Sequence, residues 1–122
     1  MMKLRSLAVA ALIFGAGVAA GVAVAEDRKP EATVKVAFEN PRVAVRAIDM
    51  APGAARPGRT RPTDEVVLFC DEAHYQAIDA QGHKEARDRT PGTVVFHKQG
   101  ELAPTLVNNG GRPIHYYSIS LK

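Results

Sequence analysis

Apolar and polar residues alternate along most of this chain, and a repeat of two residues restricts the fold to one built from strands. Glycine, proline and asparagine turn signals separate these segments at short intervals. Segment 54–62 carries three arginines, two prolines and a glycine, and we expect it to be irregular. No segment has the spacing of an amphipathic helix of normal length, so we predict an all-β antiparallel sandwich or barrel. The predicted strands are residues 33–38, 42–50, 65–70, 73–79, 83–90, 93–97 and 115–121.

Residues 1–25 have the pattern of a secretory signal peptide. Lys3 and Arg5 precede an uncharged apolar run that ends in small residues at Ala23 and Ala25, which suits signal-peptidase cleavage after Ala25. An uncleaved anchor is the alternative, because the run approaches the roughly 20 residues that cross a bilayer. Its richness in alanine and glycine favours cleavage. We therefore expect a periplasmic or secreted protein with no stable membrane insertion after cleavage.

The mature chain predicted by this cleavage consists of a flexible leader, residues 26–32, and one domain, residues 33–122. Its formal net charge falls from +3 to +1, because Lys3 and Arg5 leave with the signal. A charge this small gives no basic surface for nucleic acid, which we exclude as a partner. Cys70 is the only cysteine, so no internal disulfide can form, and its position after an apolar run predicts a buried strand residue.

A spaced set of residues crosses the irregular segment. It consists of Gly53, five residues, Arg59-Thr60-Arg61, three residues and Glu65. This set resembles the first sequence box of the cupin superfamily, which runs glycine, five residues, His-x-His, three or four residues, glutamate. Both histidine positions hold arginine here, whereas Glu65 occupies the glutamate position.

The second cupin box reads glycine, five residues, Pro-x-Gly, two residues, histidine, three residues, asparagine. This chain matches it at Gly92 and Gly100, but Lys98, Ala103 and Val107 occupy the proline, histidine and asparagine positions. Moving the frame by one residue recovers Asn108 and puts a proline at the histidine position. The resemblance covers nearly the whole mature chain and implies a jelly-roll barrel. Many cupins form homodimers in which the sheets of two barrels pair, so the resemblance also implies a possible homodimer.

The resemblance also implies a metal centre in ordinary cupins, formed by the histidines of both boxes and the glutamate. Only Glu65 survives here. A guanidinium stays protonated and has no lone pair to donate, so Arg59 and Arg61 cannot replace histidine ligands. We therefore expect a degenerate metal site and no cofactor.

Two interpretations of the first box remain open. Arg59, Arg61 and Glu65 share one face of an extended chain, which should point into the barrel. The two guanidiniums then form an anion pocket for a carboxylate or phosphate, with Glu65 orienting one of them. Alternatively, Glu65 pairs with one arginine and fills the site, while the other arginine reaches solvent.

The four histidines offer a relocated divalent-metal site as a further alternative. His97 and His115 lie on strands that would carry the second half of a cupin cavity, and Glu65 would be their third ligand. No histidine pair has the short spacing of a known metal motif, so this alternative is the weaker one.

Three functions therefore follow from the sequence. The leading prediction is an exported domain that binds a small anion or serves a structural role, without catalysis. The first alternative is a metal-dependent small-molecule enzyme that uses the relocated ligands. The second is a dimerising interaction module. Val66, Leu68 and Cys70 share one face of a strand, opposite Val67 and Phe69, and in a sandwich one of these faces packs the core while the other must be covered by something else.

Overall fold

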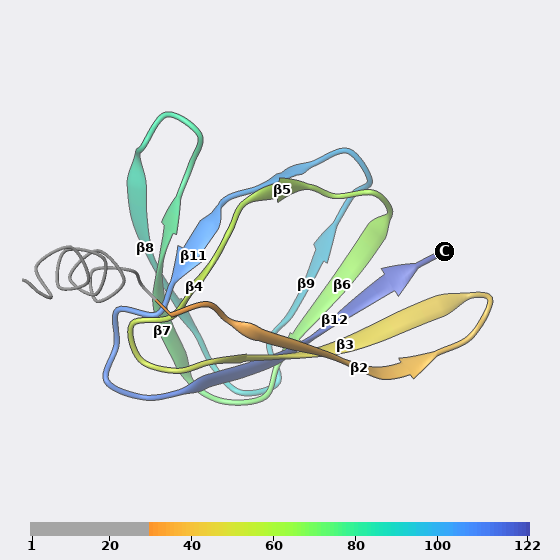
Figure 1. Cartoon of the computed structure of the whole chain (residues 1–122), viewed down its shortest axis with the longest axis horizontal. Helices are drawn as coiled ribbons and strands as arrows, with labels where there is room; N and C mark the ends of the chain where they lie inside the picture. Colours follow the sequence, from red (N-terminus) through yellow and green to blue (C-terminus); the bar gives the residue numbers. More distant parts are fainter. Residues whose placement is uncertain (1–29) are drawn as a thin grey trace, which may run out of the picture.

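The structure, a computed structural model, describes residues 30–122 and is built from strands (Figure 1). The signal peptide and residues 26–29 of the predicted leader lie outside the described residues. The strands are β2 (Thr33–Glu39), β3 (Val43–Met50), β4 (Ala55–Arg56), β5 (Arg59–Thr60), β6 (Asp64–Phe69), β7 (Ala73–Ile78), β8 (Lys84–Arg89), β9 (Val94–His97), β10 (Leu102–Ala103), β11 (Thr105–Val107) and β12 (Ile114–Leu121). No helix of the described part is long and apolar enough to cross a membrane.

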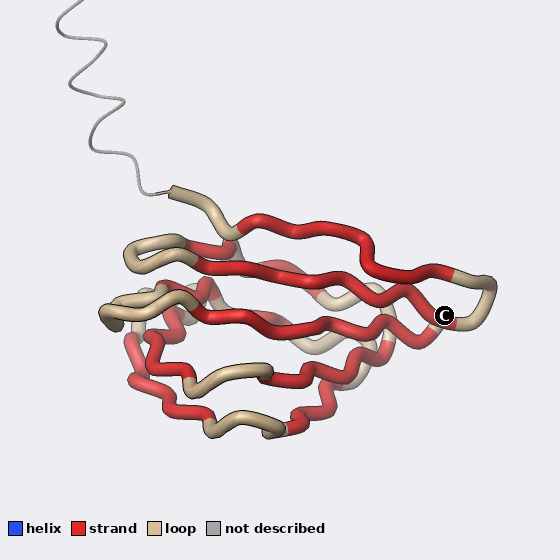
Figure 2. Tube along the Cα trace, turned by 90° about the horizontal axis from the view of Figure 1, so that it is seen from below, coloured by secondary structure: helices blue, strands red, loops and turns tan. Residues whose placement is uncertain are grey.

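The strands form two antiparallel sheets that face each other across the interior (Figure 2). The larger sheet has the order β2-β3-β12-β6-β9, and the smaller has the order β4-β11-β7-β8. In Figure 1 the smaller sheet lies on the left and the larger one on the right. A short β5–β10 ladder joins two loops between the sheets, with Ala103 opposite Arg59. This arrangement is a jelly roll, and the all-β prediction is confirmed.

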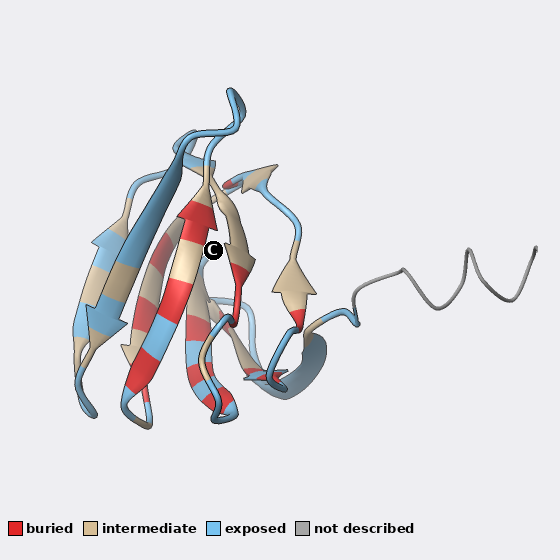
Figure 3. Cartoon of the chain, turned by 90° about the vertical axis from the view of Figure 1, so that its left-hand side faces the viewer, coloured by how far each residue is buried: buried red, intermediate tan, exposed pale blue. Residues whose placement is uncertain are grey.

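Alternation along each strand decides which side chains enter the interior. On β7 every second residue is buried, beginning with Ala73 and Tyr75, and the strand at the centre of Figure 3 shows this pattern. β6 behaves in the same way, since Glu65, Val67 and Phe69 are buried. The short apolar run over residues 65–70 is typical of a strand buried on both faces, whereas the outward residues of β6 are only partly buried. A sheet that closes only one side of a sandwich leaves its other face open.

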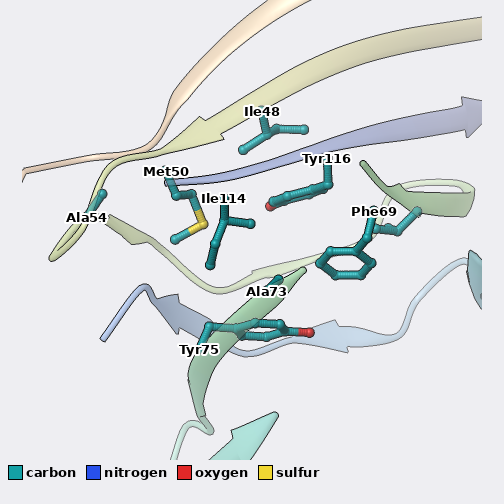
Figure 4. Packing of buried hydrophobic residues seen from close by; sticks show 9 residues of the cluster. Ile48, Met50, Ala54, Phe69, Ala73, Tyr75, Ile114 and Tyr116 are labelled. Carbon is teal, nitrogen blue, oxygen red and sulfur yellow. The ribbon is translucent and has the colours of Figure 1, made fainter. Parts of the chain in front are cut away.

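Apolar residues from both sheets meet at one end of the barrel (Figure 4). Ile48, Met50 and Tyr116 come from the larger sheet, and Tyr75 comes from the smaller one. The ring of Phe69 lies between the two tyrosines, with ring centroids 6.0 Å from Tyr75 and 5.4 Å from Tyr116. Full burial of a side chain such as Ile48 contributes about 1.5–3 kcal/mol to stability. This core leaves the other part of the interior to polar side chains.

Several local expectations differ from the structure. Segment 54–62 contains β4 and β5, whose two-residue ladders are too short to produce a periodic pattern. Residues 30–32 belong to the fold rather than to a leader, because Ala32 and Pro30 exchange backbone hydrogen bonds with Ala55. Cys70 is exposed, since β6 ends one residue before it and the chain turns there.

The glycines that open the two cupin-like boxes both lie in turns. Gly53 and Gly92 each have a φ of 85°, a left-handed conformation that other residues adopt only at a cost. The Gly53 turn precedes β4 and β5, and the Gly92 turn precedes β9. These strands carry polar side chains of the interior.

Candidate functional site

Glu65 is the centre of a buried ion-pair network inside the barrel. It lies on the inward face of β6 and is 3% exposed. Arg59 Nη2 donates to both carboxylate oxygens at 3.0 Å, and Arg61 Nη1 donates to Oε1. Arg61 is itself buried, whereas the Arg59 side chain is 31% exposed. The positions of the two cupin histidines therefore hold side chains that bind the glutamate of the same box.

The network keeps Glu65 ionised. Burial by itself would raise the pKa of this carboxyl group, but the charge and hydrogen bonds of Arg59, with the charge of Arg61, lower the pKa below its ordinary value. The buried Ser118 hydroxyl makes no hydrogen bond of normal geometry, although it lies close enough to favour the carboxylate as well. At neutral pH the site thus contains one buried negative charge between two guanidiniums.

Arginines from several strands surround the adjoining cavity of the barrel. The cavity offers about 50 Å³ to the centres of water-sized molecules, which is roughly the space of four waters. Its polar lining consists of Arg56, Arg59, Arg61, Arg87, Arg89, His97, Tyr75 and Tyr116. No aspartate or glutamate of the described residues lines it. Glu65 lines a second hollow next to this cavity and contacts Arg59 and Arg61 from that side. Arg59 and Arg61 share Glu65, and Arg87 pairs with Glu85 at 2.9 Å, so the five guanidiniums leave the space with a net positive charge.

Two of these arginines have no carboxylate partner within the described part of the chain. Arg56 Nη1 donates to the Tyr116 hydroxyl at 2.8 Å, and its guanidinium lies 5.9 Å from the Tyr116 ring centroid. The Arg89 guanidinium lies 5.8 Å from the Phe69 ring centroid, and its buried Nε has no hydrogen-bond partner. Stacking on aromatic faces holds both side chains in place while their charges stay uncompensated.

Arg61 and Tyr116 also present unused donors to the cavity. Arg61 Nε is buried without a hydrogen bond and lies 3.8 Å from Glu101 Oε1. Burial raises the pKa of Tyr116 although Arg56 opposes the shift, so the phenol keeps its proton at neutral pH. Its oxygen accepts from Arg56, which leaves the hydroxyl hydrogen available to a ligand. Buried donors without partners are rare and costly, so they mark a place where an acceptor belongs.

The structure brings together the three residues that the first box indicated. Arg59, Arg61 and Glu65 meet as the parity argument predicted. Both arginines bind Glu65, whereas the simpler interpretation left one of them free in solvent. Their role in ligand binding stays a prediction.

Only two of the three alternative metal ligands are brought together, because His97 lies directly opposite Glu65 in the β6–β9 ladder while His115 lies apart. His97 lines the cavity, but its Nδ1 is 2.9 Å from Glu101 Oε1. His115 lies on the outward face of β12, 2.5 Å from Asp71 Oδ2, while its neighbour Tyr116 faces the interior. Among residues 30–122 no three His, Cys, Asp or Glu side chains are placed to hold a metal ion. The residues at the ordinary cupin metal position do not fit a cation, because guanidiniums surround the single carboxylate.

The second box contributes shape rather than ligands. Ala103, at the cupin histidine position, lines the cavity with a methyl group. Its backbone oxygen would lie 2.7 Å from a Cβ added at Gly58, so only glycine allows β5 to pass this close. Gly58 therefore allows Arg59, the next residue, to pair with Ala103 at the lining of the cavity.

Arg56, Arg87 and Arg89 were missed by the sequence analysis. Arg87 and Arg89 face inward because they pair across β8 with Tyr75 and Ala73, which are buried. The sequence does show that Arg87 and Arg89 share one face of the strand, because they are two residues apart. Their direction was not visible, since β8 reads Lys-Glu-Ala-Arg-Asp-Arg and is polar on both faces.

The sequence matches no model of a protein family and no curated protein. Its fold is similar to that of solved structures. A cupin domain from Bordetella pertussis Tohama I aligns with a TM-score of 0.71 and 20% identity, over 78% of this chain and 97% of that chain. A protein with a double-stranded β-helix domain from Klebsiella pneumoniae aligns with a TM-score of 0.60 and 19% identity, over 80% of this chain and 85% of that one.

An enzyme is also among the similar structures. A sugar phosphate isomerase from the cupin superfamily, from Silicibacter pomeroyi, aligns with a TM-score of 0.57 and 14% identity, over 81% of this chain and 73% of that one. At such identities the likeness concerns the fold, and the fold hosts many functions. Two cupin-like boxes, a jelly-roll topology and these structural neighbours agree. The chain therefore has the fold of the cupin superfamily.

Proposed function

We propose that this protein binds a small oxyanion, a carboxylate or a phosphate, in the arginine-lined cavity. The observation that carries the proposal is the convergence of five arginines on about 50 Å³ of space whose lining contains no acidic residue. Glu65 compensates Arg59 and Arg61 only in part, and Arg56 and Arg89 have neutral neighbours. An uncompensated charge in a partly dry site is costly, and a bound anion removes that cost.

The donors suit an oxyanion in particular. Guanidinium groups present planar sets of N–H donors that match carboxylate and phosphate oxygens. Arg61 Nε, Arg89 Nε and the Tyr116 hydroxyl can supply hydrogen bonds that no described residue uses. Since the cavity admits roughly four waters, the part of a ligand that enters it is no larger than a small oxyanion.

Replacing Arg89 by glutamine is expected to weaken anion binding. A hydrogen bond to a charged group is worth about 1.5–3 kcal/mol, so the dissociation constant should rise roughly 10- to 100-fold. Isothermal titration calorimetry of the purified protein with phosphate, sulfate and acetate, at low ionic strength, measures this change. Low salt matters because mobile ions screen the arginines.

Arg112→Gln serves as the control for that titration. Arg112 is exposed and does not line the cavity, yet its substitution removes the same charge. We expect wild-type affinity from it. If wild-type protein binds none of the three anions, or if both variants lose affinity equally, the cavity is not an anion site.

A second function, assembly into a homodimer, is favoured by the outer face of the larger sheet. Phe96, Val94, Phe38, Tyr117 and Leu121 are exposed there, between 37% and 63%. A monomer rarely leaves so many neighbouring large apolar side chains in water. Two copies of one flat sheet can stack face to face at about 10 Å, which covers this surface.

Replacing Phe96 by glutamate tests the homodimer. The substitution places a charge in the apolar face, where association would bury it, and we expect at least a tenfold weaker dimer. Light scattering coupled to size exclusion measures the mass over a range of concentrations. Leu102→Glu is the matched control, because Leu102 is 71% exposed but lies on β10. A wild-type protein that stays monomeric at about 0.1 mM would exclude this assembly.

The enzymatic alternative receives no support from a specific arrangement of residues. Glu65, the buried acidic group of the ion-pair network, is engaged by two arginines, and His97 is engaged by Glu101. Neither is therefore placed as a free base. Export from the cytoplasm stays a prediction from the sequence.

A further inference from the structure

A second positively charged hollow adjoins the cavity. It has a volume of about 490 Å³ and lies along the inner faces of β3 and β12. Arg56 and Arg59 line both hollows, so these two residues belong to the wall between them. Four cationic residues line the second hollow, namely Arg46, Arg56, Arg59 and Lys122, against one carboxylate, Glu65.

Arg46 is the residue that gives this second hollow its own anion-binding capacity. It is partly buried on β3, and its guanidinium donates a hydrogen bond to a neutral group, Ser120 Oγ, at 3.2 Å. No carboxylate of the described residues lies within ion-pairing distance of its guanidinium. Glu39 feels its charge, but Lys122 already binds Glu39 at 2.6 Å. Arg46 is therefore a partly desolvated cation whose negative partner is missing.

The two hollows thus repeat the same arrangement on either side of Arg56 and Arg59. In the cavity the guanidinium without a carboxylate is Arg89, and in the second hollow it is Arg46. Arg56, whose partner is the neutral Tyr116 hydroxyl, borders both. A single anion in the cavity leaves Arg46 uncompensated, whereas a ligand with a second negative group beyond Arg56 satisfies both ends.

We propose that the ligand carries two separated anionic groups, one in the cavity at Arg89 and one in the second hollow at Arg46, with Arg56 and Arg59 between them. The class comprises short-chain dicarboxylates and bisphosphonate-like molecules. This inference rests on the proposed function, because the first anionic group occupies the cavity already assigned to an oxyanion. Arg46 then determines specificity for ligands with two charges.

A titration of matched ligands tests the proposal. Glutarate and adipate are compared with butyrate, and propane-1,3-bisphosphonate with methylphosphonate, which separates carboxylate from phosphonate recognition. Wild-type protein should bind at least one doubly anionic ligand tenfold or more tightly than its singly anionic counterpart. Arg46→Gln should remove that preference and leave the affinity for the singly anionic ligand unchanged. Arg89→Gln should weaken both.

Further variants keep the outcome interpretable. Arg46→Lys retains the charge and should retain part of the preference, and Arg112→Gln should behave as wild type. A melting curve of each variant shows that it is folded. If singly anionic ligands bind and Arg89→Gln weakens them, but doubly anionic ligands bind no better, the second subsite is wrong and the oxyanion function stands. If no anion binds, both proposals fall.

Discussion

Replacing Glu65 by glutamine is expected to lower the free energy of unfolding at pH 7 by about 3 kcal/mol, the low end for breaking a buried ion pair. The glutamine has nearly the same shape but no charge, so Arg61, which is buried, loses its negative partner. The partial exposure of Arg59 reduces the effect, since water can solvate that guanidinium. For a domain of this size, 3 kcal/mol corresponds to a fall of at least about 12 °C in Tm.

The effect of this substitution should depend on pH. The pKa of Glu65 is lowered in the folded protein, so the ion pair contributes its stability above the ordinary value of 4.5. That contribution disappears as the pH falls through the lower, folded-state pKa. Wild-type protein should therefore lose more stability than Glu65→Gln between about pH 5 and pH 2, and the two should converge in acid. Urea unfolding at several pH values measures both curves.

Glu65→Gln should also increase the affinity for anions. The Glu65 carboxylate competes with any anionic ligand for Arg59 and Arg61. A neutral amide in its place leaves the positive charge of both arginines available to the ligand. We expect at least a tenfold lower dissociation constant for phosphate. The substitution would thus destabilise the empty protein and strengthen its complex, which separates a binding site from a purely structural ion pair.

Glu72→Gln is the control for both measurements. Glu72 is also a glutamate in an ion pair, with His74 at 2.7 Å, but both side chains are about half exposed. A surface pair contributes about 0–1 kcal/mol, so this variant should remain close to wild type in stability and affinity. A difference below 1 kcal/mol for Glu65→Gln, independent of pH, would contradict the buried network.

The sequence predicted the long strands because their alternation is strong. β3, β6 and β12 lie within two residues of the predicted segments, and each buries every second side chain over much of its length. The spacing of the first box also predicted that Arg59, Arg61 and Glu65 share a face. Both results depend on local geometry, which a single sequence carries.

The rest of the site depends on pairing between distant segments. Arg87 and Arg89 enter the interior because β8 pairs with β7, and a strand that is polar on both faces does not reveal this. Arg46 shares an inner face with Ser118 and Ser120 only because β3 and β12 pair along their full length. The size of the cavity, and the aromatic rings that hold Arg56 and Arg89, follow from sheet packing and could not be predicted.

Replacing Asn108 by alanine is expected to destabilise the fold by about 3 kcal/mol. Asn108 is fully buried where β11 ends, and its Nδ2 donates to Met50 O at 3.0 Å and to Arg112 O at 2.8 Å. Its Oδ1 accepts from Gly110 N at 3.1 Å. Alanine leaves three backbone groups without this partner, at about 1 kcal/mol each. Thermal and urea unfolding measure the loss.

Asn108→Asp separates the donors from the acceptor. It keeps an oxygen for Gly110 but sets a second oxygen against two carbonyl groups, so it should destabilise at least as much as alanine. The neighbouring Asn109 is exposed, and Asn109→Ala should change stability by less than about 0.5 kcal/mol. A loss below 1 kcal/mol for Asn108→Ala would show that water replaces the amide.

Loss of Asn108 should also affect the proposed anion site. Its backbone exchanges hydrogen bonds with Gly53 at 2.7 Å and with Ala54 at 2.9 Å, directly before β4 carries Arg56 into the cavity. If the side chain holds this corner in register, Asn108→Ala should weaken phosphate binding at a temperature where the variant is still folded, while Asn109→Ala should not. Wild-type affinity in a folded Asn108→Ala protein would mean that β4 and Arg56 are positioned by their pairing with β11 alone.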